Sequence, residues 1–394
     1  MFPLSNAPTP PRGAYDVVII GAGISGINTA FHLQNQLPNL RYAIIEGRDK
    51  IGGTWDLFRY PGIRSDTDLQ SFGFAWRPWT EDRAIADGES IARYLAESAA
   101  EAGIYSNIHF QHEAKTANWR PESQAWALEV ETNGRRLEME ARFLVLGSGY
   151  YDYKEPLQPN IPGLSNFRGQ VVHPQFWPDN LDMAGKRVVI IGSGATAITL
   201  LPNIAKVARS TTMLQRSPTY ILSIDNATNN SLYTEYSRNR GGSRLGADII
   251  VTATGLKLGL GGRIQFSVAG KAVDLADRYA WRSVLFQDIP NLAFMIGYVN
   301  ASWTLGAETS AQTLCRLLRH MDSKSLTSAT PRIPASIQPV PLWNLNSTYV
   351  KEAANALPKC GDSGPWVGRS NYFLDLFKAR FSSITEDLEF AKGD

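Results

Sequence analysis

Apolar and polar residues follow one another in two similar patterns along the chain. In the first, the apolar stretch Tyr15–Ile20 precedes a glycine-rich turn at residue 21, a helical stretch to about residue 37 and an apolar strand over 42–45. In the second, Lys186–Ile191 precedes a turn at residue 192, a helix over 198–207 and a strand over 210–214. Short apolar strands alternating with helices are typical of parallel α/β sheets. We therefore predict an α/β fold with two Rossmann-like, three-layer dinucleotide-binding domains.

The first turn has the spacing of a dinucleotide-binding loop. Gly21, Gly23 and Gly26 form G-x-G-x-x-G around Ser25, and Glu46 ends the second strand 25 residues after Gly21. Such glycines allow a tight turn, close approach of backbone to pyrophosphate and close packing of helix on strand, while the helix start holds phosphate. A carboxylate at the position of Glu46 accepts hydrogen bonds from ribose hydroxyls. These five residues are predicted to bind the first nucleotide.

The second turn reads G-x-G-x-x-A and ends differently. Arg216, 24 residues after Gly192, takes nearly the offset that the acid has in the first pattern. An arginine suits a ribose 2′-phosphate, whereas a carboxylate suits a free 2′-hydroxyl. We therefore predict FAD at the first loop and NADPH at the second. The residues predicted to bind NADPH are Gly192, Gly194, Ala195, Thr196, Arg216 and Ser217.

The remaining pattern predicts how the two domains are connected. It indicates an amphipathic helix over 89–102, a β-meander over 106–146, a strand and turn over 247–255, a strand over 291–297 and a helix over 306–321. We expect a discontinuous FAD-binding domain (14–150 and 246–394). A shortened NADP-binding domain (151–245) interrupts it, and residues 1–13 form a flexible arm.

Composition excludes several classes of protein. The 394 residues are 43% hydrophobic and 19% charged, which suits a sizeable core. A net charge of +2 predicts no nucleic-acid partner. The chain has no apolar run long enough for a membrane span and no signal-peptide pattern, and its two cysteines fit a reducing compartment, so we expect a cytoplasmic enzyme. His32, His109, His112 and His320 lack metal-ligand spacing and are expected to be solvated or on helix faces.

Two further motifs carry a family resemblance. Residues 167–178 fit Phe-x-Gly-x-x-x-His-x-x-x-Trp-Pro around His173, and residues 52–66 read G-G-T-W-D-L-F-R-Y-P-G-I-R-S-D. The first resembles the signature of type I Baeyer–Villiger monooxygenases, and the second resembles the flavin-contacting segment of class B flavin monooxygenases. Over most of the chain, the resemblance is to the ethionamide-activating branch and related fungal enzymes.

The resemblance implies a function and a set of site residues. The chain is expected to use FAD, NADPH and O₂ to insert one oxygen atom into a ketone, or to oxygenate a thioether or amine, through a flavin C4a-peroxide. The two glycines allow backbone to approach the flavin, and Trp55 and Tyr60 can wall it from water. The residues implied by this segment and the signature are Gly53, Thr54, Trp55, Tyr60 and Asp66 as flavin contacts and Arg64, Asp66 and His173 as catalytic residues.

The chain also departs from this family. The family carries a long helical segment where this chain has only the polar stretch 225–245, and Arg238, Arg240 and Arg244 match no family motif. Two alternatives therefore stay open: an uncoupled NADPH oxidase that produces H₂O₂, and a truncated, inactive flavoprotein. Disulfide reductases share the fold but need a redox cysteine pair near the flavin, and no cysteine precedes Cys315.

Overall fold

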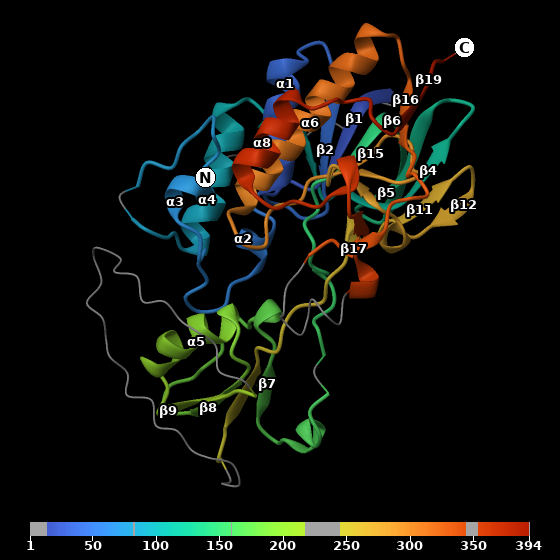
Figure 1. Cartoon of the computed structure of the whole chain (residues 1–394). Coiled ribbons are helices and arrows are strands. Elements are labelled where there is room, and N and C mark those ends of the chain that lie inside the picture. The colour runs from blue at the N-terminus through green and yellow to red at the C-terminus, as the bar shows by residue number, and fades with distance from the viewer. Residues whose placement is uncertain (1–13, 82, 159, 217–244, 344–353, 394) are drawn as a thin grey trace.

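The chain forms a larger and a smaller domain, each built on its own parallel-rich sheet (Figure 1). The computed structural model describes residues 14–81, 83–158, 160–216, 245–343 and 354–393. The arm predicted over 1–13, Ser217 and nearly all of the polar stretch 225–245 lie outside these residues. The α/β class predicted from the sequence pattern is confirmed.

The larger domain contains an 11-stranded sheet, in which eight strands follow the order β12-β11-β4-β5-β6-β1-β2-β3. The strands of this sheet are β1 (Ala14–Ile20), β2 (Tyr42–Glu46), β3 (Ile108–Phe110), β4 (Glu113–Arg120), β5 (Ala125–Thr132), β6 (Arg135–Leu146), β11 (Gln265–Val268), β12 (Lys271–Val273), β13 (Ala280–Trp281), β14 (Leu285–Phe286) and β15 (Leu292–Phe294).

Strand β6 joins the predicted meander to the nucleotide-binding sheet. Its first half pairs antiparallel with β5, from Arg135 to Ala141. Its second half pairs parallel with β1 and with β15. The sequence pattern predicts a meander that ends at residue 146, and in the structure its last strand is 12 residues long and continues into the parallel part of the sheet.

Helices cover the parallel part of this sheet. They are α1 (Ile24–Gln36), α2 (Thr54–Leu57), α3 (Leu69–Phe72), α4 (Gly88–Glu101), α6 (Trp303–Ser323) and α8 (Tyr372–Phe381). Helix α6 packs on α1 and α8, and Figure 1 shows the three side by side over the sheet. Two short antiparallel strand pairs complete the domain: β16 (Ser328–Pro331) with β19 (Leu388–Ala391), and β17 (Pro339–Pro341) with β18 (Lys359–Gly361).

The smaller domain has a four-stranded parallel sheet in the order β7-β10-β8-β9. Its elements are β7 (Gln170–Val172), β8 (Arg187–Ile191), helix α5 (Ala195–Ala205), β9 (Ser210–Leu214) and β10 (Ile249–Thr252). The boundary predicted at residue 246 assigns β10 to the larger domain. The structure corrects this assignment, because β10 is hydrogen-bonded between β7 and β8.

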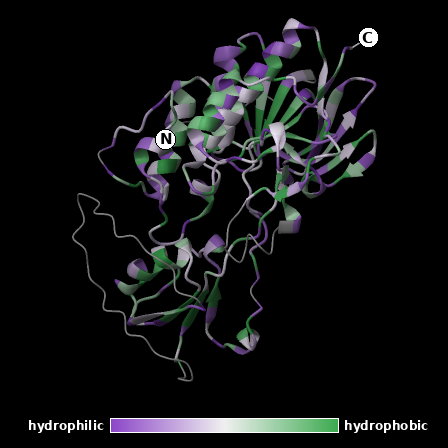
Figure 2. Ribbon diagram, in the orientation of Figure 1, coloured by the Kyte–Doolittle hydropathy of each residue, from purple (hydrophilic) through white to green (hydrophobic). Residues whose placement is uncertain are grey.

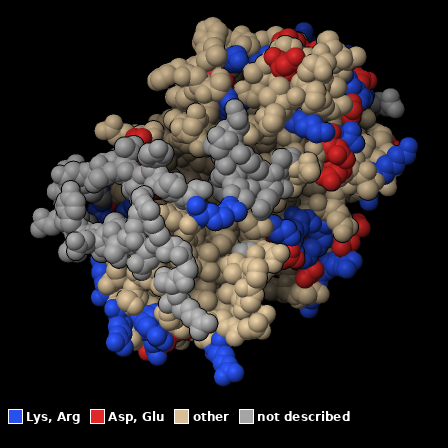
Figure 3. Space-filling model, turned by 60° about the horizontal axis from the view of Figure 1, so that its bottom comes forward, with Lys and Arg blue, Asp and Glu red and all other residues tan. Residues whose placement is uncertain are grey.

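The strands form the apolar interior of both domains, as the hydropathy colouring in Figure 2 shows. Acidic and basic side chains lie close to one another on the face seen in Figure 3, in keeping with the small net charge. No helix in the described ranges is long and apolar enough to cross a membrane. His109 is buried on β3, so the expectation that it is solvated or on a helix face is wrong, whereas His32 does lie on a helix, α1. The Nε2 atom of His32 lies 2.7 Å from an oxygen of Glu308.

Candidate active site

A cavity of about 760 Å³ lies against the carboxyl ends of the parallel strands of the larger domain. Ligands of open α/β sheets bind at this edge. Its walls come from the first glycine loop, the segments 52–55 and 64–67, the crossover 147–154 and the turn 259–264, and Ala195 of the second glycine loop also lines it. Residues of both predicted nucleotide loops thus meet in one cavity.

The backbone of the first glycine loop packs more closely than a side chain would allow. Gly21 has a φ of +100°, in the region that favours glycine. A Cβ atom on Gly26 would lie 1.9 Å from the carbonyl oxygen of Gly21, and one on Gly53 would lie 3.3 Å from the Cα atom of Gly23. Helix α1 begins at Ile24, and no side chain caps its first turn. Its free backbone N–H groups therefore form a place for an anionic group.

Glu46 closes this end of the cavity. Its Oε2 accepts a hydrogen bond from the backbone of Ala22 (2.8 Å), and its Oε1 accepts one from the backbone of Arg48 (2.9 Å). Burial raises the pKa of the Glu46 carboxyl, and these hydrogen bonds and the Arg48 charge oppose that rise. Each oxygen can accept a further hydrogen bond from a ligand hydroxyl.

Aromatic rings form the opposite wall. Trp55 meets Phe72 edge to face at 5.9 Å, and Trp303 stacks on Tyr150 at 4.7 Å. The indole N–H of Trp303 donates to the hydroxyl of Ser25 (2.9 Å), which itself donates to the carbonyl of Met295. Ser25 therefore lines the cavity as predicted, but its hydroxyl is engaged in joining α1 to α6.

The crossover that leaves β6 contributes residues absent from the predicted site. The hydroxyl of Ser148 is buried and has no hydrogen-bond partner among the described residues. The hydroxyl of Tyr153 lies 2.9 Å from that of Thr54, a predicted site residue. The sequence signal for this segment is the Gly-Ser-Gly turn that begins at Gly147 directly after a buried strand.

Arg64 and Asp66 both line the cavity and face solvent. Their side chains are 44% and 62% exposed, and the Nε of Arg64 lies 3.8 Å from a carboxylate oxygen of Asp66. Two of the three predicted catalytic residues, Arg64 and Asp66, are thus brought together at the mouth of the cavity.

Tyr60 lies against the smaller domain, outside the cavity wall. It packs on the apolar core beneath α5. Burial raises its pKa, and a hydrogen bond with Thr196 opposes that rise. Gly62 approaches the same helix so closely that a Cβ atom there would lie 2.0 Å from the amide nitrogen of Asn203. The segment that lines the cavity at Trp55 therefore continues onto α5.

The second glycine loop repeats the geometry of the first. Gly192 has a φ of +131°, a Cβ atom on it would lie 2.1 Å from the carbonyl oxygen of Ala253, and no side chain caps the start of α5 at Gly194. These features leave the first turn of α5 open to an anionic group.

The residue that matches Glu46 in this second unit is Gln215, which the spacing did not identify. The N–H of Gly21 donates to Ile45, one residue before Glu46, and the N–H of Gly192 donates to Leu214, one residue before Gln215. A neutral amide therefore takes the place of the acid, and the exposed Arg216 follows it.

His173 is half-buried at the start of a short turn in the linker. Its Nδ1 accepts a hydrogen bond from the backbone of Gln175 (3.2 Å). Burial lowers the pKa of His173, and a backbone contact with Gly255 opposes that change. His173 does not line the cavity at Arg64 and Asp66.

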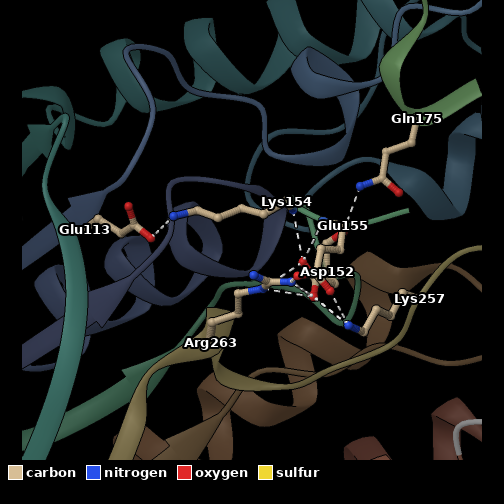
Figure 4. Close-up of polar contacts among 7 residues, drawn as sticks. All are labelled: Glu113, Asp152, Lys154, Glu155, Gln175, Lys257 and Arg263. Carbon is tan, nitrogen blue, oxygen red and sulfur yellow. Dashed lines mark hydrogen bonds and ion pairs between the residues drawn. The ribbon is translucent and has the colours of Figure 1, made fainter. Parts of the chain in front are cut away.

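The two linkers between the domains run side by side and are joined by an ionic cluster (Figure 4). Tyr151 and Leu258 form an antiparallel bridge, and the N–H of Asp152 donates to the carbonyl of Lys257 (2.9 Å). The carboxylate of Asp152 accepts from Nε and Nη2 of Arg263 at 2.9 and 2.7 Å. Lys257 and Arg263 both pair with Glu155 as well, and the side-chain amide of Gln175 donates to the Asp152 carbonyl (2.7 Å).

Comparison with known proteins places the chain in a family. The model of the pyridine nucleotide-disulphide oxidoreductase family matches residues 18–239. The FAD-containing monooxygenase EthA of Mycolicibacterium smegmatis is 36% identical, over 96% of this chain and 97% of that protein. The probable FAD-binding monooxygenase AlmA of Acinetobacter baylyi is 35% identical, over 93% and 94%.

A solved structure of an oxidized steroid monooxygenase bound to NADP superposes with a TM-score of 0.75. It is 18% identical and covers 97% of this chain and all of that one, so it shows the fold alone. The alignment with EthA spans 478 positions, more than the 394 residues of this chain, so the relative carries residues without a counterpart here.

The disulphide chemistry in the family name has no support in the described residues. Cys315 and Cys360 are both buried, and each lies in a different apolar core. Burial raises the pKa of each thiol to about 12. A redox cysteine needs an accessible thiolate, which burial disfavours.

Proposed function

Because this chain belongs to the FAD-containing monooxygenases, within the pyridine nucleotide-disulphide oxidoreductase family, we propose that it binds FAD at the first glycine loop and NADPH at the second. It inserts one atom of O₂ into a ketone, in a Baeyer–Villiger reaction, or oxygenates a thioether or amine. The observation that carries this proposal is that residues of both glycine loops, Gly21–Ser25 and Ala195, line one cavity.

The residues present fit FAD. Its pyrophosphate fits against the uncapped start of α1, and Gly21 and Gly26 allow the close backbone packing that forms this turn, because a Cβ atom on either would meet a backbone carbonyl oxygen. The free acceptor capacity of Glu46 suits ribose hydroxyls. The unpartnered hydroxyl of Ser148 gives the ligand a buried hydrogen-bonding group that the described protein leaves unused.

NADPH fits the second loop for a related reason. The start of α5 receives the pyrophosphate, and the guanidinium of Arg216 pairs with the 2′-phosphate. Gln215 in place of an acid avoids repulsion of that phosphate, so both residues favour NADPH over NADH.

When bound, FAD supplies the chemistry of hydride acceptance from NADPH and of oxygen activation. The chain's own residues orient the reactants and control solvent. Trp55 and Trp303 cover the apolar side of the cavity and exclude water from it. Arg64 presents a cation where negative charge develops on oxygen, and Asp66 holds the guanidinium of Arg64 in place. Tyr60 packs on the core of the smaller domain and holds it beside this cavity.

Exposure of Arg64 and Asp66 favours a second candidate function. A site that is open to solvent shields a reactive oxygen intermediate poorly from water. The enzyme can then reduce O₂ without transferring an oxygen atom to an organic substrate. The product would then be H₂O₂, as in an uncoupled NADPH oxidase.

The deciding experiment measures NADPH-dependent O₂ uptake by the purified flavoprotein with a panel of ketones and thioethers, with and without catalase. O₂ consumption equal to the oxygenated product, with no O₂ returned by catalase, supports the monooxygenase. Return of about half of the O₂ without organic product supports the oxidase, because catalase releases one O₂ for two H₂O₂. No NADPH-dependent uptake would refute both functions.

A further inference from the structure

A second cavity, of about 300 Å³, lies beside the start of helix α6. Its walls include Ser283, Gly297, Tyr298, Val299, Trp343 and Arg369. Val299 also lines the large cavity, so the two cavities are neighbours across one residue. The second cavity contains none of the residues to which a nucleotide contact has been assigned.

Arg369 brings an incompletely paired cation to this cavity. Its Nη atoms donate to the hydroxyls of Thr309 and Ser310, and its guanidinium lies 5.5 Å from the centre of the Tyr298 ring. Its Nε is buried and has no hydrogen-bond partner among the described residues. Neutral partners leave the charge of a buried guanidinium without compensation.

The nearby carboxylate does not form an ion pair with Arg369. Asp375 accepts a hydrogen bond from the Tyr298 hydroxyl (2.8 Å) and one from the backbone of Ser370 (3.2 Å). Within the described ranges, no carboxylate oxygen lies within ion-pair distance of Arg369. Burial disfavours its charged form and lowers its pKa, which the Asp375 charge only partly opposes.

Ser283 supplies a second unpartnered group from a different element. Its side chain is 1% exposed, and its hydroxyl has no partner among the described residues. It lies in the turn between β13 and β14, where Arg282 and Ser283 have φ values of 50° and 52°. This left-handed conformation is costly for residues other than glycine and persists only where surrounding contacts enforce it.

Those contacts are present at Arg282. Its N–H donates to the carbonyl of Pro365 (2.6 Å), and its Nη2 donates to the carbonyl of Ser383 (2.7 Å). The strained turn is therefore held so that Ser283 and Arg369 both line this cavity, and the same two residues also line a smaller one, of about 40 Å³, beside Asp375 and Lys378. Together they offer one neutral and one charged donor, which is the donor set that a carboxylate accepts.

We propose that this cavity binds the carboxylate of the organic substrate, and that the substrate is a ketone carrying a carboxylic acid. The carboxylate accepts hydrogen bonds from Arg369 Nε and Ser283 Oγ, and the ketone extends past Val299 toward the flavin cavity. The ketone in this inference rests on the proposed monooxygenase function. The carboxylate rests on the cavity alone.

A kinetic test compares 4-oxopentanoate with its methyl ester, which has the same ketone without the charge. The holoenzyme should have a KM for the acid at least tenfold below that for the ester. In Arg369→Gln this preference should fall by roughly tenfold to a hundredfold, because one partner of a buried charged hydrogen bond is lost. Arg332→Gln, which removes an exposed arginine that pairs with Asp288 and Glu389, should keep the preference. Equal KM values for acid and ester in the wild type would overturn the proposal.

A binding test separates this inference from the proposed function, because it needs no turnover. The melting temperature of the flavoprotein is measured with 4-oxopentanoate, its ester, acetate and chloride, in the wild type, Arg369→Gln and Ser283→Ala. Stabilisation by 4-oxopentanoate alone, reduced in both variants, supports the site even if no ketone is oxygenated. Equal stabilisation by acetate and chloride would show a general anion site, and unchanged stabilisation in Arg369→Gln would place the ligand elsewhere. Either result refutes the proposal.

Discussion

At the end of β9, Gln215 takes the place that Glu46 has at the end of β2, and Arg216 follows it by one residue; both side chains are exposed. A glutamate at this place would repel a ribose 2′-phosphate, whereas the glutamine does not. We therefore propose that two adjacent side chains divide the choice between NADPH and NADH, one that avoids repulsion and one that attracts.

Removing the arginine should weaken the preference for NADPH. Arg216→Ala is expected to raise the apparent Kd for NADPH in flavin reduction by about tenfold to a hundredfold, since a hydrogen bond between charged groups contributes roughly 1.5–3 kcal/mol. The Kd for NADH should change little. Stopped-flow reduction of the flavoprotein with each nucleotide measures both values.

The double variant Gln215→Glu, Arg216→Ala should reverse the preference, and Arg209→Ala, at an exposed position before β9, serves as the control. Equal losses for NADPH and NADH in Arg216→Ala would contradict the role assigned to the 2′-phosphate.

His173 gives the linker a dependence on pH. Burial lowers its pKa below the ordinary value of 6.5, so the folded protein binds fewer protons than the unfolded chain. The resulting stability is fully present above pH 6.5 and is lost as the pH falls through the lowered pKa.

The loss of melting temperature between pH 7.5 and 5.5 should therefore be smaller in His173→Gln than in the wild type. His109, whose pKa is also lowered by burial, remains in the variant and keeps part of the dependence. Identical pH profiles of melting temperature for the two proteins would show that His173 does not cause the pH dependence of stability.

At the scale of elements, the two strand–loop–helix–strand units could be predicted closely from hydrophobic periodicity and glycine spacing. Strand β9 has the predicted bounds, and α5 begins three residues earlier than predicted because Gly194 starts the helix. Strand pairing could not be predicted in the same way. The apolar run of β10 fits either sheet, and only its neighbours β7 and β8 decide which.

The candidate site divides along the same line. Gly21 and Gly26 could be predicted because the local backbone geometry requires glycine there, and Glu46 could be predicted from its spacing at the end of the second strand. Ser148, Gln215 and Arg369 could not, because their importance depends on which distant segments lie beside them. The spacing of glycines in the sequence predicts a turn. A buried hydroxyl without a hydrogen-bond partner can be recognised only in the folded structure.

The two glycine loops allow a paired test of the two nucleotide sites. Gly26→Ala places a Cβ atom 1.9 Å from the Gly21 carbonyl oxygen. Helix α1 must therefore move away from the glycine turn, at a cost of about 3 kcal/mol in stability. Gly192→Ala makes the equivalent clash, at 2.1 Å, with Ala253 in the smaller domain.

We expect Gly26→Ala to purify with little or no flavin. Gly192→Ala should keep the yellow flavin and its spectrum but lose rapid reduction by NADPH, while dithionite still reduces it. Flavin absorbance and stopped-flow reduction separate the two outcomes. Full flavin content in Gly26→Ala would refute the assignment of FAD to the first loop.

At the scale of the whole molecule, the chain passes between the two domains in two linkers, and the ionic cluster around Asp152 ties these linkers together (Figure 4). Burial alone would raise the pKa of Asp152, but hydrogen bonds from Arg263 and from the backbone of Lys154 and Glu155 outweigh it and leave the pKa below its ordinary value of 3.8. The stability from this cluster is therefore present above pH 3.8 and is lost only as the pH falls below it.

Breaking the cluster at neutral pH should loosen the linkers without unfolding either domain. Asp152→Asn keeps the shape of the side chain but removes the charge that Arg263 and Lys257 share. Lys154 and Lys257 lie in these linkers and are trypsin sites, so brief digestion should cut there severalfold faster in the variant. Fragments ending at Lys154 or Lys257, identified by mass spectrometry, would report this opening.

The matched control is Asp248→Asn, which removes an aspartate that also pairs with an arginine, Arg187, but within the smaller domain. It should leave cleavage in the linkers unchanged. Neither linker contributes a residue to the second glycine loop. If Asp152→Asn also slows flavin reduction by NADPH while flavin content stays constant, the cluster therefore controls the relative orientation of the two nucleotide sites. Equal linker cleavage in the wild type and in Asp152→Asn would mean that the backbone bridge between Tyr151 and Leu258 holds the linkers without the charges.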